Sequence, residues 1–213
     1  MKVISLVSAA LLFWTFSFAG HATPIKATYS IDLNDADLGL ILQYENILSN
    51  PFSINLDPGE SVSGPLFKIW TDEESNDLDD IFIPNAISTT FNFILPEAFG
   101  GSVSGVTGGA IEVCFLCNGH FVDDYSYGYL SWSDPVDFYF GPKHDGHLRI
   151  DLDGTMFNKG FDGFNYGEEY AGIVTGTLTL LADATAVPEP GTLAIFGFGL
   201  LGLGVCLRRR MKR

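Results

Sequence analysis

The sequence has few basic residues, and more than half of these lie at its two ends. Lys and Arg account for 11 of the 213 residues, against 26 Asp and Glu. Lys2 and five residues of the C-terminal tail supply six of the 11, so the rest of the chain carries five basic residues and all 26 acids, a formal charge of −21. A surface of that charge repels nucleic acid and anionic membranes. We therefore expect no nucleic-acid partner, and high solubility is the simplest reading of the charge.

The sequence also lacks the short motifs of the common enzyme classes. It contains no H-E-x-x-H zinc motif and no phosphate-binding loop, and the serines of "GGSVSG" (residues 100–105) do not fit the G-x-S-x-G spacing of serine hydrolases. Carboxylate pairs of the kind used in glycoside hydrolysis are inevitable among 26 acids, so they carry no information. We expect a protein that is not an enzyme.

The N-terminus has the three parts of an export signal. A positive charge at Lys2 precedes an apolar run over residues 3–18, and the small residues Gly20 and Ala22 follow it. This pattern predicts a signal peptide over residues 1–22, with cleavage between Ala22 and Thr23. An uncleaved N-terminal anchor is the alternative.

Residues 23–186 are numerous enough for one domain with a hydrophobic core. Apolar and polar residues alternate in several segments, including "KATYSIDL" from Lys26, "TTFNFIL" from Thr89 and "HLRIDLDG" from His147, and turn residues separate them. The spacing of these turns is typical of β-sandwiches and barrels. We predict a single all-β domain, a β-sandwich of jelly-roll-like form. Residues 35–49 fit either a short amphipathic helix or a buried strand.

Cysteine is scarce, and two of the three cysteines, Cys114 and Cys117, form the motif "CFLC". In an exported protein a disulfide between them is the natural prediction. The same stretch also resembles a hairpin that turns at Asn118-Gly119, with Cys117 opposite His120. A regular strand directs residues i and i+3 to opposite faces, which would keep the two thiols apart. We favour the disulfide, with an irregular strand end.

Zinc binding is an alternative role for these thiols, because "KHDGH" supplies His144 and His147 as two further ligands. The spacing of the two histidines is shorter than in common zinc sites, and metal thiolates are less expected outside the cytoplasm. Thioredoxin-like redox chemistry would require the cysteines at the start of a helix, whereas their flanks resemble strands. We predict no metal site here.

Two segments are rich in acids. "TDEESNDLDD" (residues 71–80) has six acids in ten residues, and "NKGFDGFNYGEE" (residues 158–169) partly matches a calcium-binding loop. A hard cation such as Ca²⁺ relieves repulsion between carboxylates and takes their oxygens as ligands. The EF-hand spacing nevertheless fails in both segments, and Gly160 stands where a ligand is needed. Solvated loops are the simpler prediction, with Ca²⁺ as the one cofactor left open.

Three tyrosines alternate in "DDYSYGYLSWSD", so that Tyr125, Tyr127 and Tyr129 share one face of a predicted strand. If this face is exposed, it resembles the aromatic platforms with which β-sandwich modules hold sugars. If it is buried, it belongs to the core. The alternation does not settle the choice, and we expect the core, where tyrosine is common.

The C-terminus combines an apolar run with a basic end. Residues 193–207 carry no charge. As a helix they would span about 22 Å, short of the ~30 Å of a bilayer core, but flanking residues extend their reach. We predict a membrane helix over residues 193–207 and a cytoplasmic tail formed by Arg208, Arg209, Arg210, Lys212 and Arg213. The formal G-x-G-x-x-G within this helix has no preceding strand, so it does not indicate a dinucleotide site.

The residues before this helix add a third element, Val187, Pro188-Glu189-Pro190 and Gly191. Together, residues 187–213 resemble the PEP-CTERM sorting signal of Gram-negative bacteria. The resemblance implies a substrate of exosortase, a membrane transpeptidase-like cysteine protease that recognises the Pro-Glu-Pro sequence. It further implies transient anchoring in the inner membrane and then release toward the cell surface or the exopolysaccharide matrix. A permanent anchor without processing is the alternative.

These features predict an exported surface or matrix protein with a structural or adhesive role. Its expected partners are exosortase and exopolysaccharide. A calcium- or glycan-binding β-sandwich module is the alternative, and a secreted hydrolase is a third and weaker one.

Overall fold

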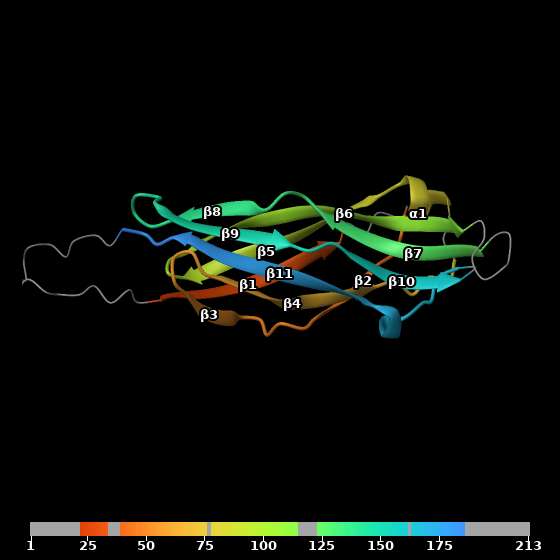
Figure 1. Ribbon diagram of the computed structural model, residues 1–213, viewed down its shortest axis with the longest axis horizontal. Coiled ribbons are helices and arrows are strands. Elements are labelled where there is room, and N and C mark those ends of the chain that lie inside the picture. Colours follow the sequence, from red (N-terminus) through yellow and green to blue (C-terminus); the bar gives the residue numbers. More distant parts are fainter. Residues whose placement is uncertain (1–21, 34–38, 76–77, 115–122, 162, 186–213) are drawn as a thin grey trace, which may run out of the picture.

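The computed structural model describes residues 22–33, 39–75, 78–114, 123–161 and 163–185. Nearly all regular structure in these ranges is β-strand (Figure 1), which confirms the prediction of an all-β domain. The elements, in chain order, are β1 (Thr23–Leu33), β2 (Gln43–Asn46), β3 (Phe52–Leu56), β4 (Ser61–Trp70), α1 (Leu78–Phe82), β5 (Asn85–Leu95), β6 (Phe99–Cys114), β7 (Asp123–Trp132), β8 (Val136–Phe140), β9 (Gly146–Leu152), β10 (Thr155–Phe161), the 3₁₀ helix η3 (Glu168–Tyr170) and β11 (Gly172–Ala182).

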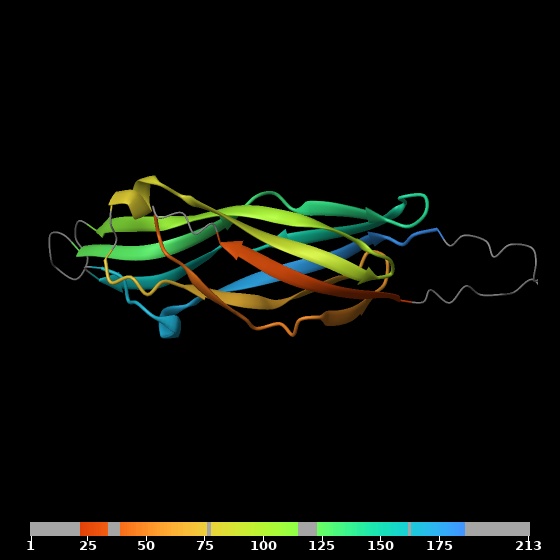
Figure 2. The same cartoon turned by 180° about the vertical axis from the view of Figure 1, so that it is seen from behind.

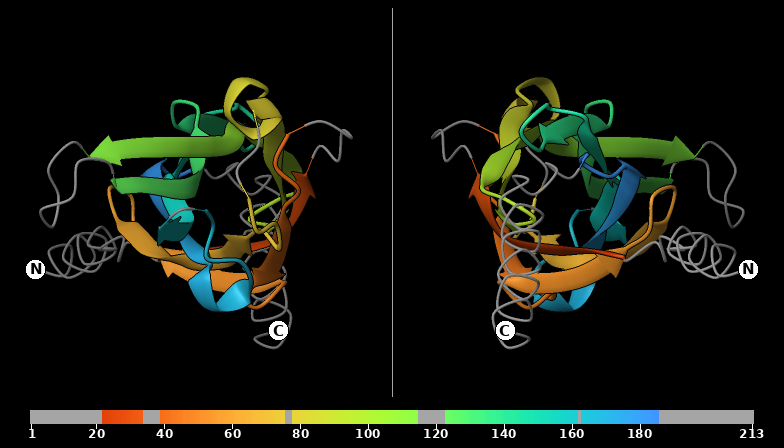
Figure 3. Two further views of the ribbon diagram at one scale, coloured as in Figure 1. Left: turned by 90° about the vertical axis from the view of Figure 1, so that its right-hand side faces the viewer. Right: turned by 90° about the vertical axis from the view of Figure 1, so that its left-hand side faces the viewer.

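The strands form two antiparallel sheets that run along the long axis of the molecule (Figures 1 and 2). The six-stranded sheet has the order β10-β7-β6-β5-β1-β3, and the five-stranded sheet has the order β2-β4-β11-β9-β8. Seen end-on, both sheets curl around a shared interior (Figure 3). Most strands therefore have one face toward the core and one toward solvent, whereas all four residues of β2 are exposed.

The apolar residues that alternate with polar ones in the sequence are the residues that face the core. In β1, Ala27, Tyr29 and Ile31 are buried, while the residues between them are more exposed. β5, β9 and β11 follow the same pattern, as predicted. Because successive side chains of a strand point to opposite faces, this pattern directs a continuous apolar surface inward from both sheets.

Phenylalanines join the two sheets near one end of the core. Phe99 of β6 stacks on Phe93 of β5 with ring centroids 4.4 Å apart, and on Phe140 of β8 with centroids 5.3 Å apart. Phe138 also contacts Phe93 edge to face, at 5.6 Å. Offset and edge-to-face ring contacts add to the free energy gained by burying the rings. They fix this part of the six-stranded sheet against β8 of the other sheet.

One segment differs from a sequence-based expectation. Within described residues 39–49 the chain forms no helix, so the helical alternative is wrong there; Leu40 and Leu42 are buried, and β2 follows them. β9 ends just before Asp153-Gly154, and these two residues lead into β10 of the other sheet.

Both ends of the described domain lie at the same end of the long axis (Figure 1). Thr23 begins β1 and pairs with Leu56. Thr185, the last described residue, donates its backbone N–H to Asp145 Oδ1 at 3.2 Å, in the turn between β8 and β9. The opposite end carries α1, β10 and the ends of β6 and β7 (Figure 1). We call these the terminal end and the far end.

In the described ranges, no helix has the length and apolar character needed to cross a bilayer. The predicted membrane helix, residues 193–207, and nearly all of the predicted signal peptide lie outside the described residues.

Candidate functional site

The tyrosines of β7 face away from the core, so the expectation that they pack inside is wrong. Ser126, Gly128 and Leu130 are the buried residues of this strand, and the tyrosines that alternate with them are half-buried on the outer face of the six-stranded sheet. The reason lies in the neighbouring strand. Phe157 of β10 is buried against Gly128, and its ring fills the space that an inward side chain of β7 would need.

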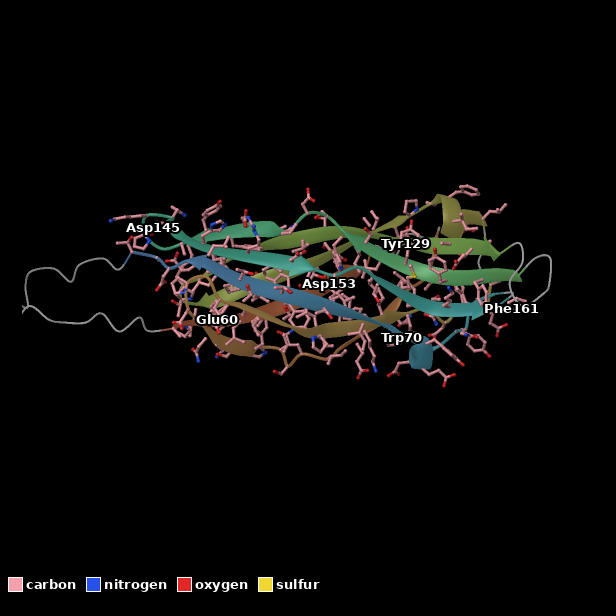
Figure 4. The ribbon with its side chains drawn as sticks, viewed as in Figure 1. Glu60, Trp70, Tyr129, Asp145, Asp153 and Phe161 are labelled. Carbon is pink, nitrogen blue, oxygen red and sulfur yellow. The ribbon has the colours of Figure 1, made fainter. Side chains whose placement is uncertain are left out.

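Strand register surrounds the tyrosines with outward-facing residues of β6 and β10. On β6, Glu112 is opposite Tyr125 and Gly108 is opposite Tyr129. On β10, Met156 is opposite Tyr129 and Phe161 is opposite Tyr125. Met156 and Phe161 are about three-fifths exposed. Figure 4 labels Tyr129 and Phe161 on this part of the molecule.

We call this surface the tyrosine platform and define it by the residues Tyr125, Tyr127, Tyr129, Glu112, Met156, Lys159 and Phe161. The ring of Phe161 meets that of Tyr125 edge to face, with centroids 5.7 Å apart. The row of tyrosines is about 13 Å long, because alternate residues of a strand are separated by roughly 6.6 Å. A platform of this length can contact more than one ring of a polymer.

Lys159 lies over the middle of the platform. Its ammonium nitrogen is 5.1 Å from the ring centroid of Tyr125 and 5.7 Å from that of Tyr127, within the range of cation–π attraction. The same nitrogen is 3.0 Å from Glu112 Oε2. The platform thus holds a hydrogen-bond donor and an acceptor side by side between aromatic rings.

A buried asparagine fixes the bulge that carries Lys159. The pairing of β10 with β7 shifts between Phe157 and Gly160, and Asn158 within this bulge has a φ of 53°. The Asn158 side chain accepts a hydrogen bond from Thr71 N at 2.9 Å and donates to Thr71 O at 3.1 Å. Asparagine tolerates this left-handed conformation better than most residues. The bulge is therefore held from the opposite sheet.

Helix α1 lies at the side of the platform. A Cβ on Gly108 would come 3.0 Å from the Tyr129 hydroxyl and 3.2 Å from the Asp80 carbonyl oxygen, so the helix backbone and the tyrosine converge above this glycine. Leu78 and Phe82 of the helix are each 73% exposed. They are exposed apolar side chains on this helix.

The two acid-rich segments meet at the far end. Gly167 N–H donates to Thr71 O at 2.9 Å, and a hollow of about 630 Å³ is lined by Asp72, Tyr166, Gly167, Glu168 and Glu169. One of its carboxylates, Glu168, pairs with Lys68, which also pairs with Glu45. In the described part of the chain, no group of three or more His, Cys, Asp or Glu side chains is placed to hold a metal ion. Calcium binding stays an untested alternative to the predicted solvated loops.

Cys114 and the two histidines of the zinc alternative lie at opposite ends of the molecule. β6 starts at Phe99, which stacks on Phe140 beside the turn that contains His144, and it ends at Cys114. Sixteen residues of extended strand separate these points by about 50 Å. The zinc alternative with His144 and His147 is therefore wrong for Cys114. His147 instead lies 3.0 Å from Asp137 Oδ1 and stacks on Tyr139.

The predicted hairpin between β6 and β7 is confirmed in its described part. The ladder runs from Gly105 opposite Trp132 to Cys114 opposite Asp123 without a register shift. The turn and Cys117 lie outside the described residues. The disulfide between Cys114 and Cys117 stays a prediction, which alkylation of free thiols with and without reductant would test.

A comparison with protein families finds that residues 186–210 match the PEP-CTERM protein-sorting motif. The C-terminal region is a PEP-CTERM sorting motif. It marks an exported protein that exosortase processes at the membrane on its way to the cell surface. Neither curated proteins nor solved structures gave a match. The family match thus concerns the sorting motif alone, and its residues, among them Pro188, Glu189 and Pro190, lie outside the described ones.

Proposed function

We propose that the two-sheet domain is a surface-displayed adhesion module that binds exopolysaccharide through the tyrosine platform. The observation that supports this most strongly is the outward row of Tyr125, Tyr127 and Tyr129. A tyrosine offers an apolar ring face and a hydroxyl, which complement the C–H face and the hydroxyl rim of a sugar ring. Glu112 and Lys159 supply an acceptor and a donor beside the rings.

The position of the platform supports display. Thr23 and Thr185, the residues nearest the predicted signal peptide and the sorting motif, lie at the terminal end, whereas the platform lies toward the far end (Figures 1 and 4). While residues 193–207 hold the protein in the inner membrane of a Gram-negative cell, the platform lies toward the end of the domain opposite Thr185. After processing it faces the matrix.

Affinity electrophoresis of the exported protein in gels that contain soluble polysaccharides tests the binding role. We expect a polysaccharide to retard the wild type, and Tyr127→Ala to abolish most of the retardation. Tyr139→Ala is the matched control, because Tyr139 is an exposed tyrosine on the outer face of the other sheet. Equal retardation of the two variants, or no retardation of the wild type by any polymer, would contradict the proposal.

Mass spectrometry of the surface-exposed protein tests the sorting role. We expect a mature N-terminus at Thr23 and the loss of the basic tail, residues 208–213. An intact Arg213 in surface material would exclude processing and support the permanent anchor.

A further inference from the structure

We infer that the tyrosine platform selects neutral polysaccharides and rejects acidic ones. This inference rests on the proposed function, because it names the class of polymer that the platform binds. Its first support is the charge of the domain. Between the signal peptide and the basic tail, five basic residues face 26 acids. A polyanion approaching such a surface meets repulsion, which reaches roughly 20 Å at low salt.

The local arrangement points the same way. Lys159 is the cation of the platform with which a sugar carboxylate could pair, but its ammonium group already pairs with Glu112 at 3.0 Å. A carboxylated polymer would have to displace Glu112 from the lysine or lie against it. Contact between the polymer carboxylate and Glu112 is repulsive. If Glu112 is displaced instead, the free energy lost by breaking its pair with Lys159 offsets the attraction between Lys159 and the polymer. A neutral polymer neither repels Glu112 nor has to break the pair between Glu112 and Lys159.

The pair still has hydrogen-bonding capacity for a neutral sugar. An ammonium group has three donors, and a carboxylate has two acceptor oxygens. Glu112 and Lys159 are about half exposed, so both groups remain accessible beside the tyrosine rings. A sugar hydroxyl both donates and accepts, and it can bridge the two groups without separating their charges. The platform therefore fits hydroxyl-rich, uncharged chains.

Affinity electrophoresis of the exported protein against matched polymers tests the inference. The neutral set is hydroxyethyl cellulose, dextran and galactomannan, and the acidic set is alginate and polygalacturonate, all with a chelator so that divalent ions cannot bridge carboxylates. At about 20 mM NaCl we expect at least one neutral polymer to bind about tenfold more tightly than either acidic one. Salt at about 300 mM should narrow this difference by screening the long-range repulsion.

The substitution Glu112→Gln separates the local effect from the overall charge. It frees Lys159 from its partner and should increase the affinity for alginate several-fold. Glu45→Gln is the matched control, because Glu45 also pairs with a lysine and is equally exposed, with a side-chain exposure of 59% in both cases. It makes the same change in net charge away from the platform and should leave the selectivity unchanged.

The two proposals fail in different ways. If no polymer retards the wild type, the proposed function is wrong. If alginate or polygalacturonate binds as tightly as the neutral polymers at low salt, the adhesion module stands and the neutral selectivity is wrong. If both substitutions shift the selectivity equally, the pairing of Lys159 with Glu112 has no part in it.

Discussion

The ring of Phe157 lies over Gly128 on the neighbouring strand. A Cβ on this glycine would fall 2.7 Å from Phe157 Cδ2 and closer still to Cε2 and Cζ. The two residues are paired across β10 and β7, and Phe157 is 2% exposed. Only a residue without a side chain fits at this point of the inner face of β7. Tyr127 and Tyr129, on either side of Gly128, therefore point outward.

Gly128→Ala should destabilise the fold, because the new methyl group overlaps the phenylalanine ring. We expect a loss of about 1–3 kcal/mol, the usual effect of overpacking a core, and a lower Tm by circular dichroism. Gly64→Ala is the control, since a Cβ there has no heavy atom within 4 Å, and it should change stability by less than about 0.5 kcal/mol. Equal Tm shifts in the two variants would show that the contact with Phe157 is unimportant.

The sequence predicted which residues share a face but not which face is buried. Alternation is a local property of a strand, so the strands that contain Lys26, Thr89 and His147 could be predicted from it. For β7 both faces had plausible core residues, and Phe157, which decides between them, lies 29 positions after Gly128. The sheet to which a strand belongs could not be predicted for the same reason, because it depends on pairing with distant strands: β9 and β10 follow each other in the chain but belong to different sheets.

The remaining platform residues were missed because a bulge interrupts their pattern. Regular alternation from Phe157 would place Lys159 on the inner face, but the extra residue in β10 returns it to the outer one. Glu112 on β6 is 47 positions away from Lys159 in the sequence. Gly160, two positions after Asn158, was the one available signal, since glycine within a strand often marks a bulge.

Asn158→Ala should destabilise the far end. The substitution removes the hydrogen bonds to Thr71 N and Thr71 O. Thr71 O still accepts from Gly167 N–H, but the buried Thr71 N–H loses its partner, at a cost of about 2 kcal/mol. We expect a lower midpoint in denaturant unfolding and faster hydrogen exchange of the Thr71 amide. Asn165→Ala, which removes one exposed hydrogen bond to Lys159 O, is the control and should have a smaller effect. An unchanged exchange rate at Thr71 would refute the anchoring role.

Asp137→Asn should make stability less dependent on pH in acid. Arg149, with His147 as the second partner, lowers the pKa of Asp137 to about 2. The folded pKa is below the unfolded one, so the stabilisation is present above about pH 4 and is lost as the pH falls toward about 2. Both side chains are partly exposed, so we expect a stabilisation of less than about 1 kcal/mol at neutral pH. The Tm difference between wild type and variant should vanish near the acid limit, whereas Asp32→Asn, on an exposed acid of β1, should not reproduce it.

Tyr29→Phe should make the fold less sensitive to alkali. Burial, aided by the nearby Tyr44, raises the pKa of Tyr29 to about 12. Its hydroxyl lies 2.9 Å from the carbonyl oxygen of Leu66 and joins β1 of one sheet to β4 of the other. The neutral phenol is favoured in the folded state, so its contribution is complete below about pH 10 and is lost as the pH rises through about 12. The variant should lose about 1 kcal/mol at neutral pH. Wild type and variant Tm values should then converge in alkali, and a constant difference across that range would show that folding does not raise the pKa of Tyr29.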